Sequence, residues 1–250
     1  MRTVLLCIIL VAGWSAPVFS QQLKAITNSI GMKLVLILPG EFIMGSPIEP
    51  QREVTISQWY YLAAHEVTQE QYEKVMGNNP SIFKGAKNPV EMVSWEDAVA
   101  FCKKLSEMPE EKVAGRAYRL PTEAEWEFAC RATSSTSFCS GDTAESLSEF
   151  AWFGDGRGKT HPVGEKKANR WGLYDMHGNV FEWCQDWGAD YLTGMTTDPQ
   201  GPSAGSLRVY RGGSWASDAD SCRSQYRNWS LPSNRDDRYG FRLALSPSVK

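Results

Sequence analysis

The chain has 250 residues, of which 42% are hydrophobic, and a formal net charge of -3 from 26 basic and 29 acidic side chains. This length suits one large domain or two small ones with a substantial core. Because the charges are nearly balanced and form no basic block, nucleic-acid binding has no electrostatic support.

Residues 1–20 have the pattern of a secretory signal peptide. Arg2 gives an early positive charge, and an apolar run over residues 4–11 precedes small residues up to Ser20. The run is too short to span a membrane, and no later segment approaches the roughly 18 apolar residues that a spanning helix needs. We expect cleavage near Ser20 and a secreted or periplasmic protein, with an uncleaved anchor as the alternative.

Two β-rich runs flank Pro39-Gly40 within residues 31–46 and predict a hairpin. A further β-like run, VTISQWYYLAAHEV, ends at Thr68. The sequence then changes from strand to helix periodicity.

Three helix starts follow, at Thr68, Ser94 and Thr122, each with an acid or amide three residues later. This spacing is a capping box, in which the hydroxyl and the later side chain satisfy amides of the first turn. Apolar residues then recur at helical spacing: Tyr72, Val75 and Met76; Ala98, Phe101, Cys102 and Leu105; Trp126, Ala129 and Cys130. Cys102 and Cys130 are therefore expected to be buried, inert thiols.

Beyond Arg131 the helical pattern stops. Residues 133–250 are rich in Gly, Ser, Asp, Asn and Trp, which predicts long loops and short strands held by aromatic packing. Loops of this length in a compact domain are usually functional or held by a ligand.

The cysteines and histidines constrain the chemistry. Without the signal segment five cysteines remain, at positions 102, 130, 139, 184 and 222. In an oxidising compartment an odd number leaves at least one thiol free or paired between chains. The histidines, His65, His161 and His177, are scattered and no CxxC pair occurs, which argues against a structural zinc site.

Two acidic segments allow more than one interpretation. Glu123, Glu125 and Glu127 begin the third helix, where alternate residues point to different faces, so a capped helix is favoured over an acid-base pair. The second segment offers oxygen donors around Gly178, which fit a calcium site or an ordinary turn. These donors are Asp175, Asn179, Glu182 and Asp186, and His177 is interpreted as a turn residue.

Four motifs carry a family resemblance: RLPTEAEWEFACR, NRWGLYDMHGNVFEWCQDW, VYRGGSW and YGFRLA. In this order they resemble the formylglycine-generating enzyme family, the sulfatase-modifying factors. The resemblance runs from about Ile30 to the end and implies one domain over residues 30–250. It implies an α+β, loop-rich domain with the formylglycine-generating-enzyme variant of the C-type-lectin fold.

The family's enzymes oxidise a sulfatase cysteine to formylglycine with copper(I), oxygen and two active-site cysteines, and they hold structural calcium. By resemblance, the calcium ligands would be Asp175 and Glu182 through their side chains and Gly178 and Val180 through their carbonyls. The implied partner is a sulfatase or another extracytoplasmic client protein or peptide.

The resemblance breaks in the strip that would hold the active site. Ser214 matches a serine of the oxygen pocket and Cys222 matches the second catalytic cysteine, but the first cysteine falls on Ser217. Phe181 replaces a tryptophan beside the reaction pocket. Because copper(I) is held by soft thiolates, a serine hydroxyl argues against copper and against the two-cysteine mechanism.

Three functional hypotheses remain open: a formylglycine-generating oxidase, a calcium-stabilised lectin-like binding or assembly module, and a non-haem iron oxygenase. The module would hold a peptide, protein or glycan in a groove formed by Phe181, Trp183, Trp215 and Trp229. The iron hypothesis is the weakest, because the chain has no histidine cluster. A Cys184–Cys222 disulfide is a further hypothesis.

Overall fold

The computed structural model describes residues 25–46, 51–154, 156, 158–190 and 194–246. The expected signal segment, residues 1–20, lies outside this part. No helix within these ranges is long and apolar enough to cross a membrane.

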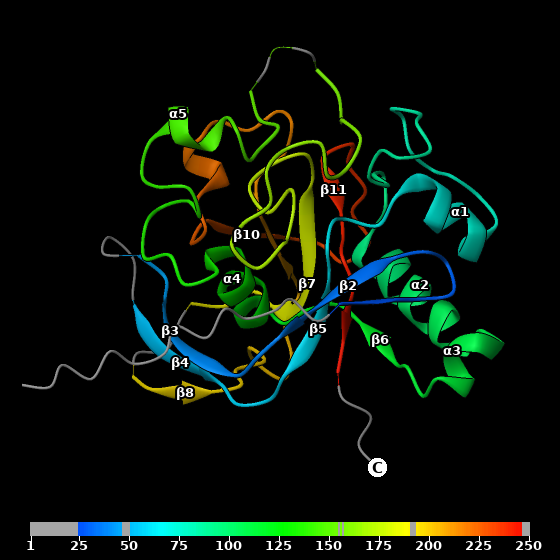
Figure 1. Ribbon diagram of the computed structural model, residues 1–250, viewed down its shortest axis with the longest axis horizontal. Helices are drawn as coiled ribbons and strands as arrows, with labels where there is room; N and C mark the ends of the chain where they lie inside the picture. Colours follow the sequence, from blue (N-terminus) through cyan, green and yellow to red (C-terminus); the bar gives the residue numbers. More distant parts are fainter. Residues whose placement is uncertain (1–24, 47–50, 155, 157, 191–193, 247–250) are drawn as a thin grey trace, which may run out of the picture.

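A five-stranded sheet brings the two ends of the domain together. Its order is β1 (Ala25–Thr27), β2 (Lys33–Ile37), β5 (Tyr60–Ala63), β12 (Ala244–Leu245) and β6 (Tyr118–Arg119), and every pairing is antiparallel. The last strand of the described chain thus lies between β5 and β6 in the middle of the fold (Figure 1).

Two smaller sheets complete the strand framework. One has the order β10 (Arg227–Ser230), β9 (Arg208–Arg211), β7 (Phe181–Trp187) and β11 (Tyr239–Gly240). The other has the order β3 (Gly40–Met44), β4 (Arg52–Ile56) and β8 (Thr196–Thr197).

The hairpin predicted around Pro39-Gly40 is wrong. β2 pairs with β1 and β5, whereas β3 pairs with β4, so the two runs belong to different sheets. Both runs do form strands, as predicted. They cannot pair with each other, because β1 and β5 occupy the two edges of β2.

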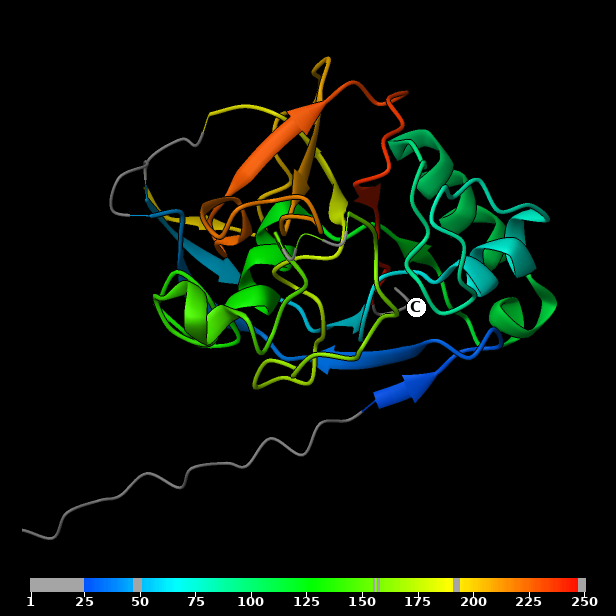
Figure 2. The ribbon, with the colours of Figure 1, turned by 90° about the horizontal axis from the view of Figure 1, so that it is seen from above.

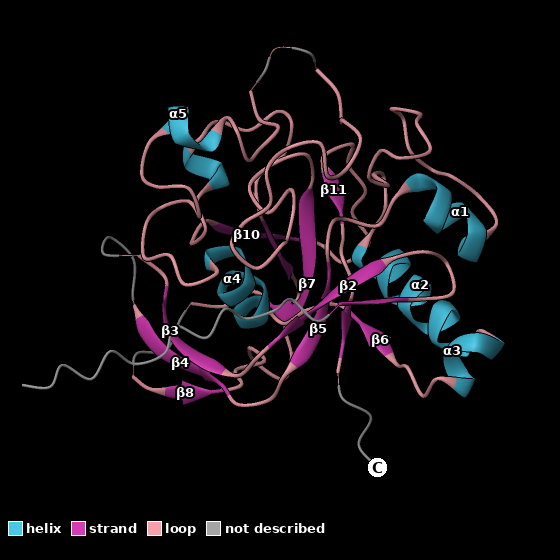
Figure 3. Ribbon diagram, viewed as in Figure 1, coloured by secondary structure: helices cyan, strands magenta, loops and turns pink. Residues whose placement is uncertain are grey.

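Three of the helices begin where the sequence predicts. The helices are α1 (Gln69–Met76), α2 (Trp95–Glu107), α3 (Pro109–Val113), α4 (Glu123–Arg131) and α5 (Ala144–Leu147), with a 3-10 helix at Asp220–Cys222. Complete capping boxes at Thr68, Ser94 and Thr122 start these three, α1, α2 and α4. Between α5 and β7 the chain is mostly loop (Figure 3), as expected.

The core has two main parts. α1 and α2 pack at one end of the molecule, and β3, β4 and α5 lie at the other, with α4 between (Figures 1 and 2). Cys102 lies in the cluster beside α2 and Cys130 in the cluster beside α4, both buried as expected.

Candidate functional site

The strip after β9 begins with a glycine pair that a larger residue could not replace. Gly212 and Gly213 both have positive φ, at 100° and 77°. A Cβ on Gly213 would lie 2.4 Å from the sulfur of Cys222. The pair therefore lets the backbone turn tightly over the Cys222 thiol.

Ser214 and Ser217 form a closed hydrogen-bonded turn. Their hydroxyl oxygens lie 3.1 Å apart, and the Ser214 amide donates to the Ser217 hydroxyl at 3.0 Å. Cys222 lies in the same strip, with its sulfur against Gly213. The structure thus brings the three strip residues together.

Cys222 is completely buried, in an apolar cluster with Phe138, Leu147 and Ala151. Burial raises the pKa of its thiol well above the usual range, and the charge of Asp218 adds to this effect. Since the thiolate is the form that attacks substrates and binds metals, Cys222 is held in its unreactive state.

His177 lies in a turn, as expected, and is also a buried connector. Its Nδ1 lies 2.8 Å from the carbonyl of Cys222, and the Cys139 amide donates to its Nε2 at 3.1 Å. A carbonyl can only accept, so Nδ1 carries the proton and both ring nitrogens are occupied. The ring ties the strip to the loop at Cys139, which the sequence did not indicate.

The expected Cys184–Cys222 disulfide is not formed. Both residues are free thiols. Cys184 packs in the cluster beside α4 with Val35 and Val209, whereas Cys222 belongs to the separate cluster around Phe138. Their strand and 3-10 helix bury them in different parts of the core.

Glu182 is neutralised by an arginine. Arg242 donates to both carboxylate oxygens at 2.6 Å, and Trp126 Nε1 donates to one of them at 2.8 Å. Glu182 and Arg242 are both fully buried. The oxygens expected to bind calcium are therefore already hydrogen-bonded.

Asp175 and Glu66 leave buried oxygens without donors. The Gly164 amide donates to Oδ2 of Asp175, but Oδ1 of Asp175 and both oxygens of Glu66 have no donor within the described part of the chain. Burial raises the pKa of Asp175 to about 6, and it raises that of Glu66 further above its usual range. With Glu182, three carboxyl groups share Arg242, so a proton or a cation must balance them.

Of the two carboxylates predicted to bind calcium, Asp175 has an oxygen free to do so, whereas both oxygens of Glu182 are hydrogen-bonded. The free oxygens of Asp175 and Glu66 are hard donors of the type calcium prefers. The side chain of Asn179 instead accepts a hydrogen bond from the His161 amide and donates one to the His161 carbonyl. Asp186 accepts a hydrogen bond from the Glu123 amide at 2.8 Å. Within the described ranges no group of three or more His, Cys, Asp or Glu side chains could hold a metal, so backbone carbonyls would have to contribute.

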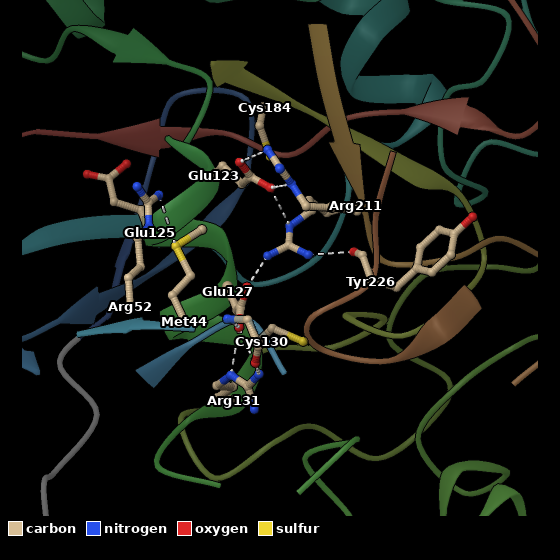
Figure 4. A network of polar contacts seen from close by, with 12 residues as sticks. Met44, Arg52, Glu123, Glu125, Glu127, Cys130, Arg131, Cys184, Arg211 and Tyr226 are labelled. Carbon is tan, nitrogen blue, oxygen red and sulfur yellow. Dashed lines mark hydrogen bonds and ion pairs between the residues drawn. The ribbon is translucent and has the colours of Figure 1, made fainter. Parts of the chain in front are cut away.

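The acids of α4 form a buried ion-pair network (Figure 4). Glu123 and Glu127, one helical turn apart, both pair with the fully buried Arg211. Arg227 holds Glu123 at 2.7 and 2.8 Å, and Arg131 pairs with Glu127. Glu125 points to another face, as expected, and pairs with Arg119. These ion pairs make the structural interpretation of the helix the right one.

Two of the four residues expected to form a groove are buried, and the other two are half-buried. Phe181 and Trp183 are buried in the core. Trp215 donates to the carbonyl of Asp237 and packs edge-on against Phe83, while Trp229 covers Gly188. None of the four expected groove residues lines the two large cavities described next.

The structure has two large cavities that the sequence did not predict. One, of about 840 Å³, lies between β3, the end of α4 and the loop at residues 133–137. The other, of about 820 Å³, lies beside α2, where the Arg208 guanidinium is 3.7 and 3.3 Å from the ring centres of Trp95 and Trp187. Two apolar residues near Pro39, Leu38 and Ile43, are exposed at the first cavity and were the feature of the sequence that could have indicated it.

Comparison with known proteins identifies relatives over most of the chain. The family model described as "Sulfatase-modifying factor enzyme 1-like domain" matches residues 20–247. Chaperone protein LppX of Paenibacillus barcinonensis is 31% identical, with 80% of this chain and 84% of that protein aligned. Formylglycine-generating enzyme of Mus musculus is 35% identical over 67% of this chain and 47% of that protein, so the chain spans about half of that relative.

Solved structures show the same fold. Treponema denticola variable protein 1 has a TM-score of 0.81 and 34% identity, covering 90% of this chain and 99% of that one. PvdO from Pseudomonas aeruginosa has a TM-score of 0.75 and 27% identity, covering 90% and 98%. These likenesses confirm the fold expected from the sequence.

Proposed function

Since the chain belongs to the family of sulfatase-modifying factor enzyme 1-like domains, we propose that it is an extracytoplasmic binding or assembly module without two-cysteine copper chemistry. The observation that carries this proposal is the hydroxyl of Ser217, which accepts a hydrogen bond from the Ser214 amide in the strip whose Gly213 lies against the Cys222 sulfur. By the family resemblance, this oxygen takes the position at which copper(I) would need the first of two sulfurs.

The surroundings of the strip also favour a non-catalytic role. Copper(I) and nucleophilic chemistry both need a thiolate, and burial opposes ionisation of Cys222. A serine nucleophile would need an adjacent base. Ser214 and Ser217 bond to each other, and the nearby ring of His177 is engaged by Cys222 and Cys139.

We include one structural calcium in the proposal. Asp175 would hold it with the carbonyls of Gly178 and Val180, and Glu66 supplies the nearest uncommitted carboxylate oxygens. Bound there, the ion would balance the excess negative charge beside Arg242 and stabilise the loop. It has no role in a reaction.

The location and the client are proposals as well. The signal-like residues 1–20 support a secreted or periplasmic location. A relative aligned over most of its length is named a chaperone protein, which favours binding another protein over oxidising it. A sulfatase or another extracytoplasmic protein or peptide would be the client.

The test is a turnover assay. The purified protein is incubated with copper(I), oxygen and a peptide containing Cys-X-Pro-X-Arg, beside an active formylglycine-generating enzyme, and the peptide is followed by mass spectrometry. We expect conversion by the active enzyme and none by this protein. Conversion of the cysteine to formylglycine by this protein would overturn the proposal.

A further inference from the structure

The cavity beside β3 has an aromatic wall. Phe42 and Phe128 have ring centres 5.3 Å apart, and Phe128 and Trp171 have ring centres 4.9 Å apart. The volume of about 840 Å³ is in the usual range for ligand pockets. The wall offers an apolar surface to a side chain of a ligand.

The free edge of β3 forms another side of this cavity. β3 is the terminal strand of the β3-β4-β8 sheet, with β4 on one side. Residues 38–43 all line the cavity, although successive side chains of a strand point to opposite faces. Residues of both faces of β3 border the cavity, as expected where the edge that no described strand pairs with lies beside it. Such an edge offers amides and carbonyls for pairing with another strand.

Two residues that line this cavity each have a buried side-chain atom without a partner in the described part of the chain. The atoms are Oε1 of Gln225 and Oγ of Ser46, whose residues are 7% and 3% exposed. A buried acceptor without a donor is costly, and native proteins rarely leave one unsatisfied. A ligand that donates a hydrogen bond to Gln225 would satisfy it.

The charges at the cavity select against anions. Glu41 and Asp142 are exposed carboxylates at its rim. The guanidinium of Arg131 also lines the cavity, but it is paired with Glu127 and donates to the carbonyls of Gly45 and Thr136. The available charge is therefore negative, and it complements a basic ligand.

We propose that the edge of β3 binds an extended peptide segment in which an apolar side chain is flanked by basic ones. The peptide backbone would add a strand to β3, and the apolar side chain would pack on Phe42, Phe128 and Trp171. The basic side chains, on the opposite face of the added strand, would approach Glu41. This inference rests on the proposed binding function and assigns its site and ligand class.

The probe is the capped peptide acetyl-Val-Lys-Phe-Lys-Val-amide, titrated into the full-length protein by calorimetry. We expect saturable binding that weakens as salt is added. Methylating alternate peptide nitrogens on the edge that would pair with β3 keeps the side chains but removes the donors. It should weaken binding at least about tenfold, as should replacing both lysines with glutamate.

Gln225→Leu is the decisive variant. It removes an acceptor that has no partner, so the thermal midpoint should be unchanged or higher while peptide affinity falls about tenfold. Gln200→Leu, in the second cavity, is the matched control and should leave affinity unchanged. Glu41→Gln should weaken binding and reduce its salt dependence.

The proposal is overturned by no saturable binding, by equal binding of the methylated peptide, or by an unaffected Gln225→Leu variant. It is also overturned if N-acetylglucosamine, a neutral sugar, binds in place of the peptide. The copper assay separates this inference from the proposed function. If the protein oxidises the cysteine peptide in that assay, the proposed non-oxidase function is wrong. If it neither oxidises that peptide nor binds the acetyl-Val-Lys-Phe-Lys-Val-amide probe, only the proposed β3 site is wrong.

Discussion

The hydroxyl of Ser217 lies 3.1 Å from the hydroxyl of Ser214 and accepts a hydrogen bond from the Ser214 amide at 3.0 Å. The sulfur of Cys222 lies against Gly213 in the same strip. We propose that Ser217 occupies the position of the family's first catalytic thiol, so that one sulfur of the pair is replaced by oxygen. The proposed loss of oxidase chemistry follows from that single atom and from the burial of the other thiol.

Ser217→Cys should restore copper(I) binding. It would place a second sulfur beside Cys222 at the Ser214 amide, and soft thiolate pairs bind copper(I). We expect about one copper(I) per chain for the variant, measured by competition with a coloured copper(I) chelator, and none for the unchanged protein. Ser135→Cys, on an exposed loop, is the control. Equal copper binding by the variant and the unchanged protein would contradict the proposed match of Ser217 to the family's first cysteine.

Arg242→Met should strongly destabilise the fold. It leaves Glu182 buried without its cation, which typically costs about 3–5 kcal/mol. Urea unfolding measures the loss, and adding Glu182→Gln should recover most of it. Arg235→Met, which breaks the exposed pair with Asp97, should cost less than about 1 kcal/mol. If both arginine variants lose a similar amount of unfolding free energy, the buried pair contributes no more to stability than the exposed one.

Calcium should raise the midpoint of thermal unfolding. A ligand that binds the folded chain at one hundred times its dissociation constant adds about 2.7 kcal/mol to the unfolding free energy. The measurement compares the protein with excess calcium and with a calcium chelator. Asp175→Ala should remove the difference, whereas Asp142→Ala, at the rim of the β3 cavity, should keep it. No shift in the unchanged protein would contradict the calcium proposal.

Asp186 should make the fold less stable as pH rises. Burial, with the nearby charge of Glu123, raises the pKa of Asp186 to about 7. The folded chain therefore binds more protons than the unfolded chain between about pH 4 and pH 7, so this group's contribution decreases across that window. Asp186→Asn can still accept from the Glu123 amide and should be more stable than the unchanged protein at pH 8. The two unfolding curves, compared at pH 5 and pH 8, should differ mainly at pH 8; a constant difference would refute the assignment.

The thiols should differ in reactivity. Cys139 is partly exposed, whereas Cys102, Cys130, Cys184 and Cys222 are buried. Brief alkylation of the native protein should label Cys139 first, and alkylation in denaturant should label all five without a reductant. A linked peptide containing Cys184 and Cys222 in an unreduced digest would contradict the free thiols.

Part of the candidate site could be predicted from the sequence. The strip from Ser214 to Cys222 was identified by its motif, and the structure brings its residues together. The calcium set was only partly consistent, because Glu182 is held by an arginine 60 residues away. No spacing within the loop could indicate that Arg242 takes both of its oxygens.

The sequence by itself determined the features that depend on neighbours along the chain. The capping boxes at Thr68, Ser94 and Thr122 each close within four residues, and helical periodicity alone buries Cys102 and Cys130. Tertiary structure decided the rest, because strand partners and ion pairs are chosen by packing across long separations. It separated β2 from β3, joined Arg211 to a glutamate 84 residues away and left the edge of β3 open beside an aromatic cavity.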